Sequence, residues 1–129
     1  MICGICGEAR WGAIMSRLIE LPDYADPVAI CFDCNLKRRA CLAGRQGKTW
    51  IEEHHPFGRA VRFTIKVSRN EHEMMHVSMR LTWDKEECTG KTLKAVERLR
   101  QDIYKVITDN DRQKTAISAL ADYERRLKC

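Results

Sequence analysis

Residues 49–81 read TWIEEHHPFGRAVRFTIKVSRNEHEMMHVSMRL, and this stretch predicts two strands followed by a helix. The first strand is expected at residues 49–54, because Pro56 and Gly58 interrupt the chain directly afterwards. The second is expected at residues 61–67, where apolar and polar side chains alternate. Its apolar members, which would share one face of the strand, are Val61, Phe63, Ile65 and Val67.

Ser68 marks the expected start of the helix, because Glu71 follows three residues later at the spacing of a capping box. We therefore expect a helix over residues 69–81. Trp50 and Trp83 flank the stretch, and they are expected in the core rather than stacked on a base.

All four histidines of the chain lie within 23 positions, at His54, His55, His72 and His76. The last two are four residues apart, so a helix would project both rings from one face, and a preceding hairpin can carry the first two over that face. Such a cluster can bind a divalent ion and leave coordination positions open for phosphate and water. Two other interpretations stay open: imidazoles without a shared function, and a metal site without catalysis.

Two C-x-x-C pairs precede this stretch, separated by 24 residues: Cys3 with Cys6, and Cys31 with Cys34. Structural zinc takes four ligands in a tetrahedron, and two such pairs from separated segments supply them with little strain. The sequence therefore predicts a structural Zn²⁺ at these four cysteines. The second pair leads into a helix that is expected to start at Asn35. Two cysteine pairs followed by a helix resemble a treble-clef or ribbon-type finger.

The remaining chain predicts helices and loops. Residues 13–21 have apolar positions in helical or mixed spacing, and residues 44–48 are expected to form a polar loop. Residues 93–106 and 117–127 repeat apolar side chains at helical spacing, with a turn signal at residues 109–111 between them. An antiparallel helical hairpin is the expected result.

Positive charge is concentrated in the middle of the chain. Residues 35–69 contain nine basic and two acidic side chains, a net charge of +7, whereas the whole chain has a net charge of +5. This favours a polyanionic partner, although a solvated basic face is the alternative. The chain shows neither a signal peptide nor an apolar run long enough to span a bilayer, so a cytoplasmic location is expected, where cysteines favour zinc over disulfides.

The segment EEHHPFGR at residues 52–59, followed by a strand and then SRNEH at residues 68–72, resembles the HNH (ββα-metal, His-Me finger) endonucleases. The resemblance is to small phage-type members that have a double histidine and a Gly-Arg turn. It covers about residues 48–82 of this chain, and the upstream pair of zinc knuckles supports it in part.

This resemblance implies a role for each histidine. His54 matches the first metal ligand, and His55 matches the general base that takes a proton from the attacking water. His72 matches the closing metal ligand, and His76 matches a further helix ligand of some members. The basic residues that would hold the flanking phosphates are Arg59, Arg62, Lys66 and Arg69.

The chain departs from the family pattern in two places. Many members have a C-x-x-C pair just before the helix histidine, where this chain has Ser68 and Glu71. The asparagine that orients the base usually lies about nine residues before the helix ligand, and that position is Phe63 here. Either Asn70, the one nearby asparagine, takes the orienting role or the site is degenerate.

Together these features predict an α+β protein made of a zinc-binding module (1–46), an HNH-like ββα motif (47–83) and a C-terminal helical hairpin (84–129). The expected function is hydrolysis of phosphodiester bonds in DNA, with RNA a lesser expectation, using a catalytic Mg²⁺, Mn²⁺, Ni²⁺ or Zn²⁺. The alternatives are an inactive zinc-finger DNA-binding protein and a protein-interaction module such as a phage-encoded inhibitor or accessory factor. In the last case the apolar stripe of the hairpin would be partly exposed, or would be covered in a homodimer.

Overall fold

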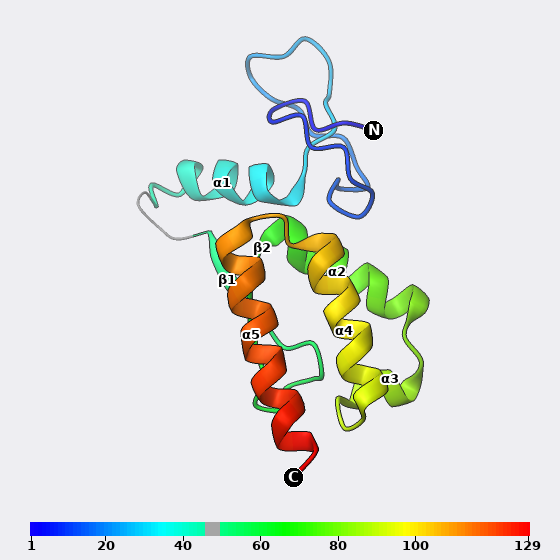
Figure 1. Cartoon of the computed structure of the whole chain (residues 1–129). Coiled ribbons are helices and arrows are strands. Elements are labelled where there is room, and N and C mark those ends of the chain that lie inside the picture. The colour runs from blue at the N-terminus through cyan, green and yellow to red at the C-terminus, as the bar shows by residue number, and fades with distance from the viewer. Residues whose placement is uncertain (46–49) are drawn as a thin grey trace.

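The computed structural model describes residues 1–45 and 50–129, and within them the fold is α+β, with five helices and one two-stranded antiparallel sheet (Figure 1). The elements are α1 (Phe32–Leu42), β1 (Ile51–His54), β2 (Ile65–Ser68), α2 (Arg69–Thr82), α3 (Lys85–Thr89), α4 (Leu93–Val106) and α5 (Asn110–Leu127). The expected loop at 44–48 and the first residue of the expected strand at 49–54 lie partly or wholly outside the described residues.

The sheet leads directly into α2. β1 and β2 pair in antiparallel register, with His54 opposite Ile65. At the end of β2 the Ser68 side chain accepts a hydrogen bond from the Glu71 amide, and the Glu71 carboxylate accepts one from the Ser68 amide. The predicted capping box and the predicted start of the helix are therefore confirmed.

β2 takes only the last part of residues 61–67, which the alternating pattern predicted as one strand. Within the described chain the residues before β2 have no strand to pair with, because β1 ends ahead of Pro56, which has no amide hydrogen. Phe63 instead packs into the core, where its ring centroid lies 5.9 Å from that of Phe57 and 5.1 Å from that of Tyr123.

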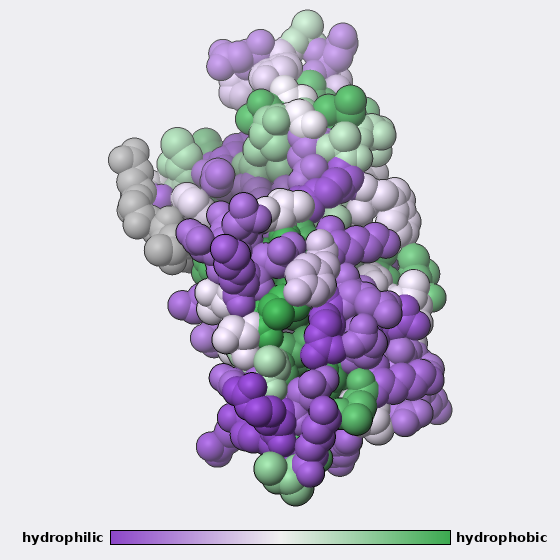
Figure 2. Space-filling view, viewed as in Figure 1, coloured by the Kyte–Doolittle hydropathy of each residue, from purple (hydrophilic) through white to green (hydrophobic). Residues whose placement is uncertain are grey.

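The main core lies between the sheet, α2 and the helical hairpin of α4 and α5, which run antiparallel to each other (Figure 1). Leu99, Ile103 and Leu120 on the facing sides of the hairpin are fully buried. The faces of α4 and α5 that Figure 2 shows are mainly hydrophilic, with apolar side chains visible between the two helices. The predicted hairpin is therefore confirmed, and it shares one core with the ββα segment.

The segment before α1 lies at one end of the molecule (Figure 1) and has a small cluster of its own. The helical or mixed element expected at residues 13–21 is not a helix. Its backbone instead forms two isolated antiparallel bridges, Ile14 with Cys31 and Ile19 with Val28. The physical reason is that extended pairing with residues 28–31 satisfies the backbone amides of this segment, and it returns the chain toward the first cysteine pair.

α1 begins at Phe32, three residues before the predicted start. The cause is the side chain of Cys31, whose Sγ accepts a hydrogen bond from the Cys34 amide at 3.4 Å and so caps the helix. Helix α3 was not predicted from the sequence. This helix starts with a second capping box, between Asp84 and Glu87.

Polar contacts near its N-terminus join α2 to α1 and to α5. The Asp33 amide of α1 donates to the Asn70 side-chain oxygen at 2.8 Å, and the Asn70 amide donates to the Asp33 carboxylate at 2.9 Å. On the other side, the buried Glu71 carboxylate forms an ion pair with Arg112 of α5.

None of the helices in the described part of the chain is long and apolar enough to cross a membrane.

Candidate functional site

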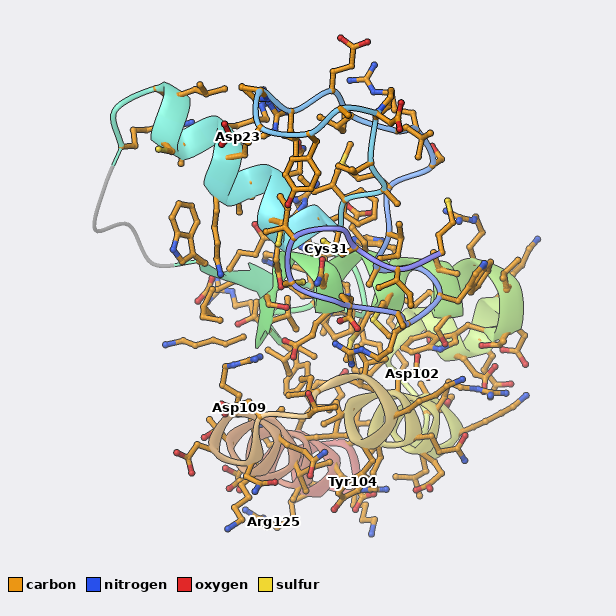
Figure 3. All side chains as sticks on the ribbon, turned by 90° about the horizontal axis from the view of Figure 1, so that it is seen from above. Asp23, Cys31, Asp102, Tyr104, Asp109 and Arg125 are labelled. Atoms are coloured by element: carbon orange, nitrogen blue, oxygen red, sulfur yellow. The ribbon has the colours of Figure 1, made fainter. Side chains whose placement is uncertain are left out.

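The two C-x-x-C pairs form one cluster. The first pair lies in the turn at the N-terminus, and the second lies at the start of α1, where Figure 3 places Cys31 beneath the N-terminal loops. The Sγ atoms of Cys3, Cys6, Cys31 and Cys34 all lie within 4.8 Å of one another. The Cys6 and Cys31 sulfurs are 3.7 Å apart, close to the ~3.8 Å that a tetrahedron with zinc–sulfur bonds of about 2.3 Å requires. The four cysteines can therefore hold a structural metal such as zinc.

The surroundings of these thiols shift their pKa values in different directions. Burial alone would raise the pKa of Cys3, but hydrogen bonds from the backbone of Cys6, Cys31 and Ile5 together lower it to about 6. Burial and the neighbouring thiols raise the pKa of Cys34. The backbone thus stabilises one thiolate, whereas four thiolates need a cation between them.

A second cluster joins the sheet to α2. His54 ends β1 and is buried, and His72 and His76 lie one turn apart on α2. The ring centroids are 4.8 Å apart for His54 and His72, 5.1 Å for His54 and His76, and 4.8 Å for His72 and His76. One ring nitrogen from each histidine lies within 4.8 Å of those from the other two, so the predicted convergence of these side chains is present.

Glu52 is the hydrogen-bond partner of one ring nitrogen of this cluster, and a second, buried ring nitrogen has none among the described residues. His72 Nδ1 lies 2.7 Å from the Glu52 carboxylate, which holds the proton on Nδ1 and leaves Nε2 as the free nitrogen. His54 Nε2 is buried and has no hydrogen-bond partner among the described residues. An orphaned buried nitrogen costs stability unless something binds it, so this geometry fits a divalent ion.

The electrostatics of the cluster favour neutral imidazoles. Burial, followed by the proximity of His72 and His76, lowers the pKa of His54 to about 3. Partial removal from water and the neighbouring His72 also lower the pKa of His76, even though part of that side chain reaches the surface. Neutral imidazole is the form that binds metals, so these side chains need not lose a proton first at neutral pH.

His55 lies beside the cluster rather than in it. It lines a hollow of about 170 Å³ together with Arg59 and the three clustered histidines. The loop that holds it is fixed by Phe57, which is buried against Gly90 and Tyr123. Among the described residues no side chain forms a hydrogen bond with the His55 imidazole.

The predicted phosphate-binding residues fall in different places. Arg59 lines the hollow, and Arg62 is exposed on the same loop outside it. Lys66 lies opposite Glu53 in the register of the two strands, and its side chain is on the face of the sheet opposite to that of His54. Arg69 lies near the cluster, but its guanidinium contacts the carboxylates of Glu52 at 3.3 Å and Glu73 at 2.9 Å.

The structure does not bring Asn70 to His55. The Asn70 side-chain oxygen is directed toward α1, where it accepts the hydrogen bond from Asp33. The alternative position, Phe63, is buried among aromatic rings. Asn70 therefore joins α2 to the N-terminal segment, and its oxygen is not free to orient the base.

Glu52 is the functional residue that the sequence interpretation missed. It lies two residues before His54, on the same face of β1, and it orients His72. Its role could have been predicted from the sequence, because side chains alternate along a strand and a residue two positions from a ligand faces the same site.

No protein-family model, curated protein sequence or solved structure with which we compared the chain matches it.

Proposed function

We propose that this protein is a metal-dependent endonuclease that hydrolyses phosphodiester bonds in DNA, with a ββα-metal site of the HNH type. The observation that carries the proposal is the convergence of three imidazoles, among them buried His54, whose Nε2 has no hydrogen-bond partner in the described chain, with a fourth imidazole, His55, in the adjoining hollow. A structural zinc at the four cysteines, in a treble-clef-like arrangement, completes the proposed fold.

The ligands would be His54, His72 and His76, and an ion bound there would offset negative charge on the scissile phosphate and on the leaving 3′ oxygen. His55 would take a proton from the attacking water, since the ordinary pKa of histidine lies close to neutral pH. Arg59, in the same hollow, would hold a phosphate oxygen.

Neighbouring residues would hold this site in shape. Glu52 fixes the ring orientation of His72 and leaves Nε2 for the ion. The reciprocal hydrogen bonds of Asn70 and Asp33 fix the N-terminus of α2 to α1, so the cysteine cluster supports the helix that carries two of the ligands.

The second candidate is a DNA-binding protein that binds metal at the histidines without cleaving. It is favoured by the position of Phe63, which is buried where family members have their orienting asparagine. A protein-interaction module built on the hairpin has less support, because the apolar stripe that includes Val96, Leu99 and Ile103 is buried inside this chain. A homodimer through these helices would have to use other residues.

Incubation of supercoiled plasmid with the purified protein in Mg²⁺, Mn²⁺, Ni²⁺ or Zn²⁺ tests the proposal, and a parallel RNA substrate tests the choice of nucleic acid. We expect nicking of DNA that requires a divalent ion. Because a chelator would also strip the cysteines, the sharper control is His54→Ala, which keeps the four-cysteine cluster. Binding of plasmid without nicking in any of these ions would refute the enzyme and support the second candidate.

A further inference from the structure

A hollow of about 510 Å³ lies between the N-terminal segment and α2. One wall is formed by Trp11, Met15 and Phe32, and the other by the exposed side of α2, including Arg80. His76 lines both this hollow and the smaller one that contains His55. The large hollow therefore continues from the histidine cluster along α2.

Trp11 leaves 75% of its surface exposed at this hollow, and both of its chain neighbours contact other parts of the fold. Arg10, next to it, donates a hydrogen bond to the Val106 carbonyl at 2.9 Å and pairs with Glu8. Gly12 on the other side has a φ of +91° and lies against Met74. The indole is thus a flat apolar surface in contact with water, which is the form of a stacking platform for a planar ligand.

The charges around the hollow favour an anionic ligand. Arg80 is exposed and forms no ion pair with any residue of the described chain, in contrast to Arg10. The acidic Glu73 in the same wall is already paired with Arg69 at 2.9 Å. A free guanidinium on α2, about one turn beyond His76 and two turns beyond His72, suits a phosphate in the same strand as the scissile one.

We propose that this hollow binds one unpaired nucleobase, stacked on Trp11, with a neighbouring phosphate at Arg80. The inference rests on the proposed action on DNA and adds a substrate class to it, namely DNA with an unpaired nucleotide beside the cleaved bond. In a duplex both faces of each base are covered by its neighbours, so an indole can stack only on a base that has left the helix or is single-stranded.

The test compares two labelled hexamers with the same number of phosphates, one of thymidines and one of abasic sugars, by fluorescence anisotropy at low salt without added divalent ions. Wild type is expected to bind the thymidine hexamer about tenfold more tightly than the abasic one, because stacking on one aromatic ring has that magnitude. Trp11→Ala should lose this preference and keep the affinity for the abasic hexamer, whereas Trp11→Phe should retain most of it.

Tyr104→Ala is the matched control, since Tyr104 is also an exposed aromatic residue but lies on α4, away from the N-terminal loops (Figure 3). Equal affinity of wild type for the two hexamers, failure to bind either, or an unchanged preference in Trp11→Ala would overturn the proposal. The assay needs no cleavage, so a base preference without nicking contradicts only the enzyme, and nicking without a base preference contradicts only the stacking site.

Discussion

The cysteine cluster and the histidine cluster differ in how the chain builds them. The four cysteines come from short loops and the start of α1, and around them only a small apolar cluster is buried. The three histidines come from a strand and a helix that rest on the main core, and they border an open hollow. A closed four-ligand set suits a metal that holds the fold, whereas a three-ligand set beside a hollow suits a metal that meets a substrate.

The largest effect should come from removal of a cysteine ligand. Cys31→Ser replaces a thiolate with a hydroxyl that can still cap α1 but is a poor zinc ligand, so we expect the bound zinc to fall from one per chain to none and residues 1–31 to lose their structure. Elemental analysis and amide hydrogen exchange measure the two effects. Cys88→Ser, at an exposed free cysteine outside the cluster, is the control. Full zinc content in Cys31→Ser would contradict the closed site.

The histidine cluster should depend on the main core instead. A Cβ at Gly90 would collide with the ring of Phe57, which fixes the His55 loop, and the φ of +70° adds strain. We expect Gly90→Ala to lower the free energy of unfolding by about 2–4 kcal/mol in urea denaturation. Gly44→Ala, with the same φ but open space, should cost only about 1 kcal/mol. Equal effects would exclude the proposed packing constraint.

Glu52 should affect only the histidine cluster. Glu52→Gln weakens the acceptor that orients His72, so the affinity for the second metal should fall about tenfold while the cysteine-bound metal stays. Calorimetric titration of zinc-loaded protein with Mn²⁺ or Ni²⁺ measures it. Glu86→Gln, at an exposed carboxylate of α3 that belongs to neither cluster, is the control, and similar losses in both variants would argue against a specific role for Glu52.

The smallest effect concerns DNA contacts. Arg59→Ala should reduce the slope of log affinity against log salt by about one unit, because Arg59 faces the hollow. Lys66→Ala should change this slope less, because the Lys66 side chain projects from the face of the sheet opposite to His54. The two variants are compared by filter binding of a short duplex at salt concentrations between roughly 50 and 200 mM. A larger change in Lys66→Ala would place the DNA on the opposite face.

The sequence predicted the parts of the fold whose signals are local. The capping box at Ser68 fixed the start of α2, and the helical spacing of apolar residues predicted α4 and α5. The spacing of the cysteines and of His72 and His76 predicted which ligands converge. For the helices and for His72 with His76 the geometry of one element accounts for this, whereas the two cysteine pairs meet across 24 intervening residues and were predicted from their matching spacing.

The parts that were missed depend on partners far along the chain. Residues 13–21 form bridges because residues 28–31 return beside them, and residues before β2 stay unpaired because β1 ends early. Asn70 faces α1 because Asp33, 37 positions away, takes its oxygen. Short apolar runs fit either a helix or a strand, so the sequence alone did not separate these cases. The capping box of α3, in contrast, was a local signal that the sequence interpretation overlooked.

The most direct test of the account separates a ligand from a base in one assay, the rate of plasmid nicking as a function of metal concentration for His72→Ala and His55→Ala. Both variants should be slower than wild type, His55→Ala by about 10²- to 10⁴-fold. Excess metal should restore His72→Ala in part, because a lost ligand weakens binding, and should leave His55→Ala unchanged, because a lost base acts after binding. Rescue of His55→Ala by metal, or nicking by His55→Ala at the wild-type rate, would contradict the assignment of the histidine cluster as a catalytic centre.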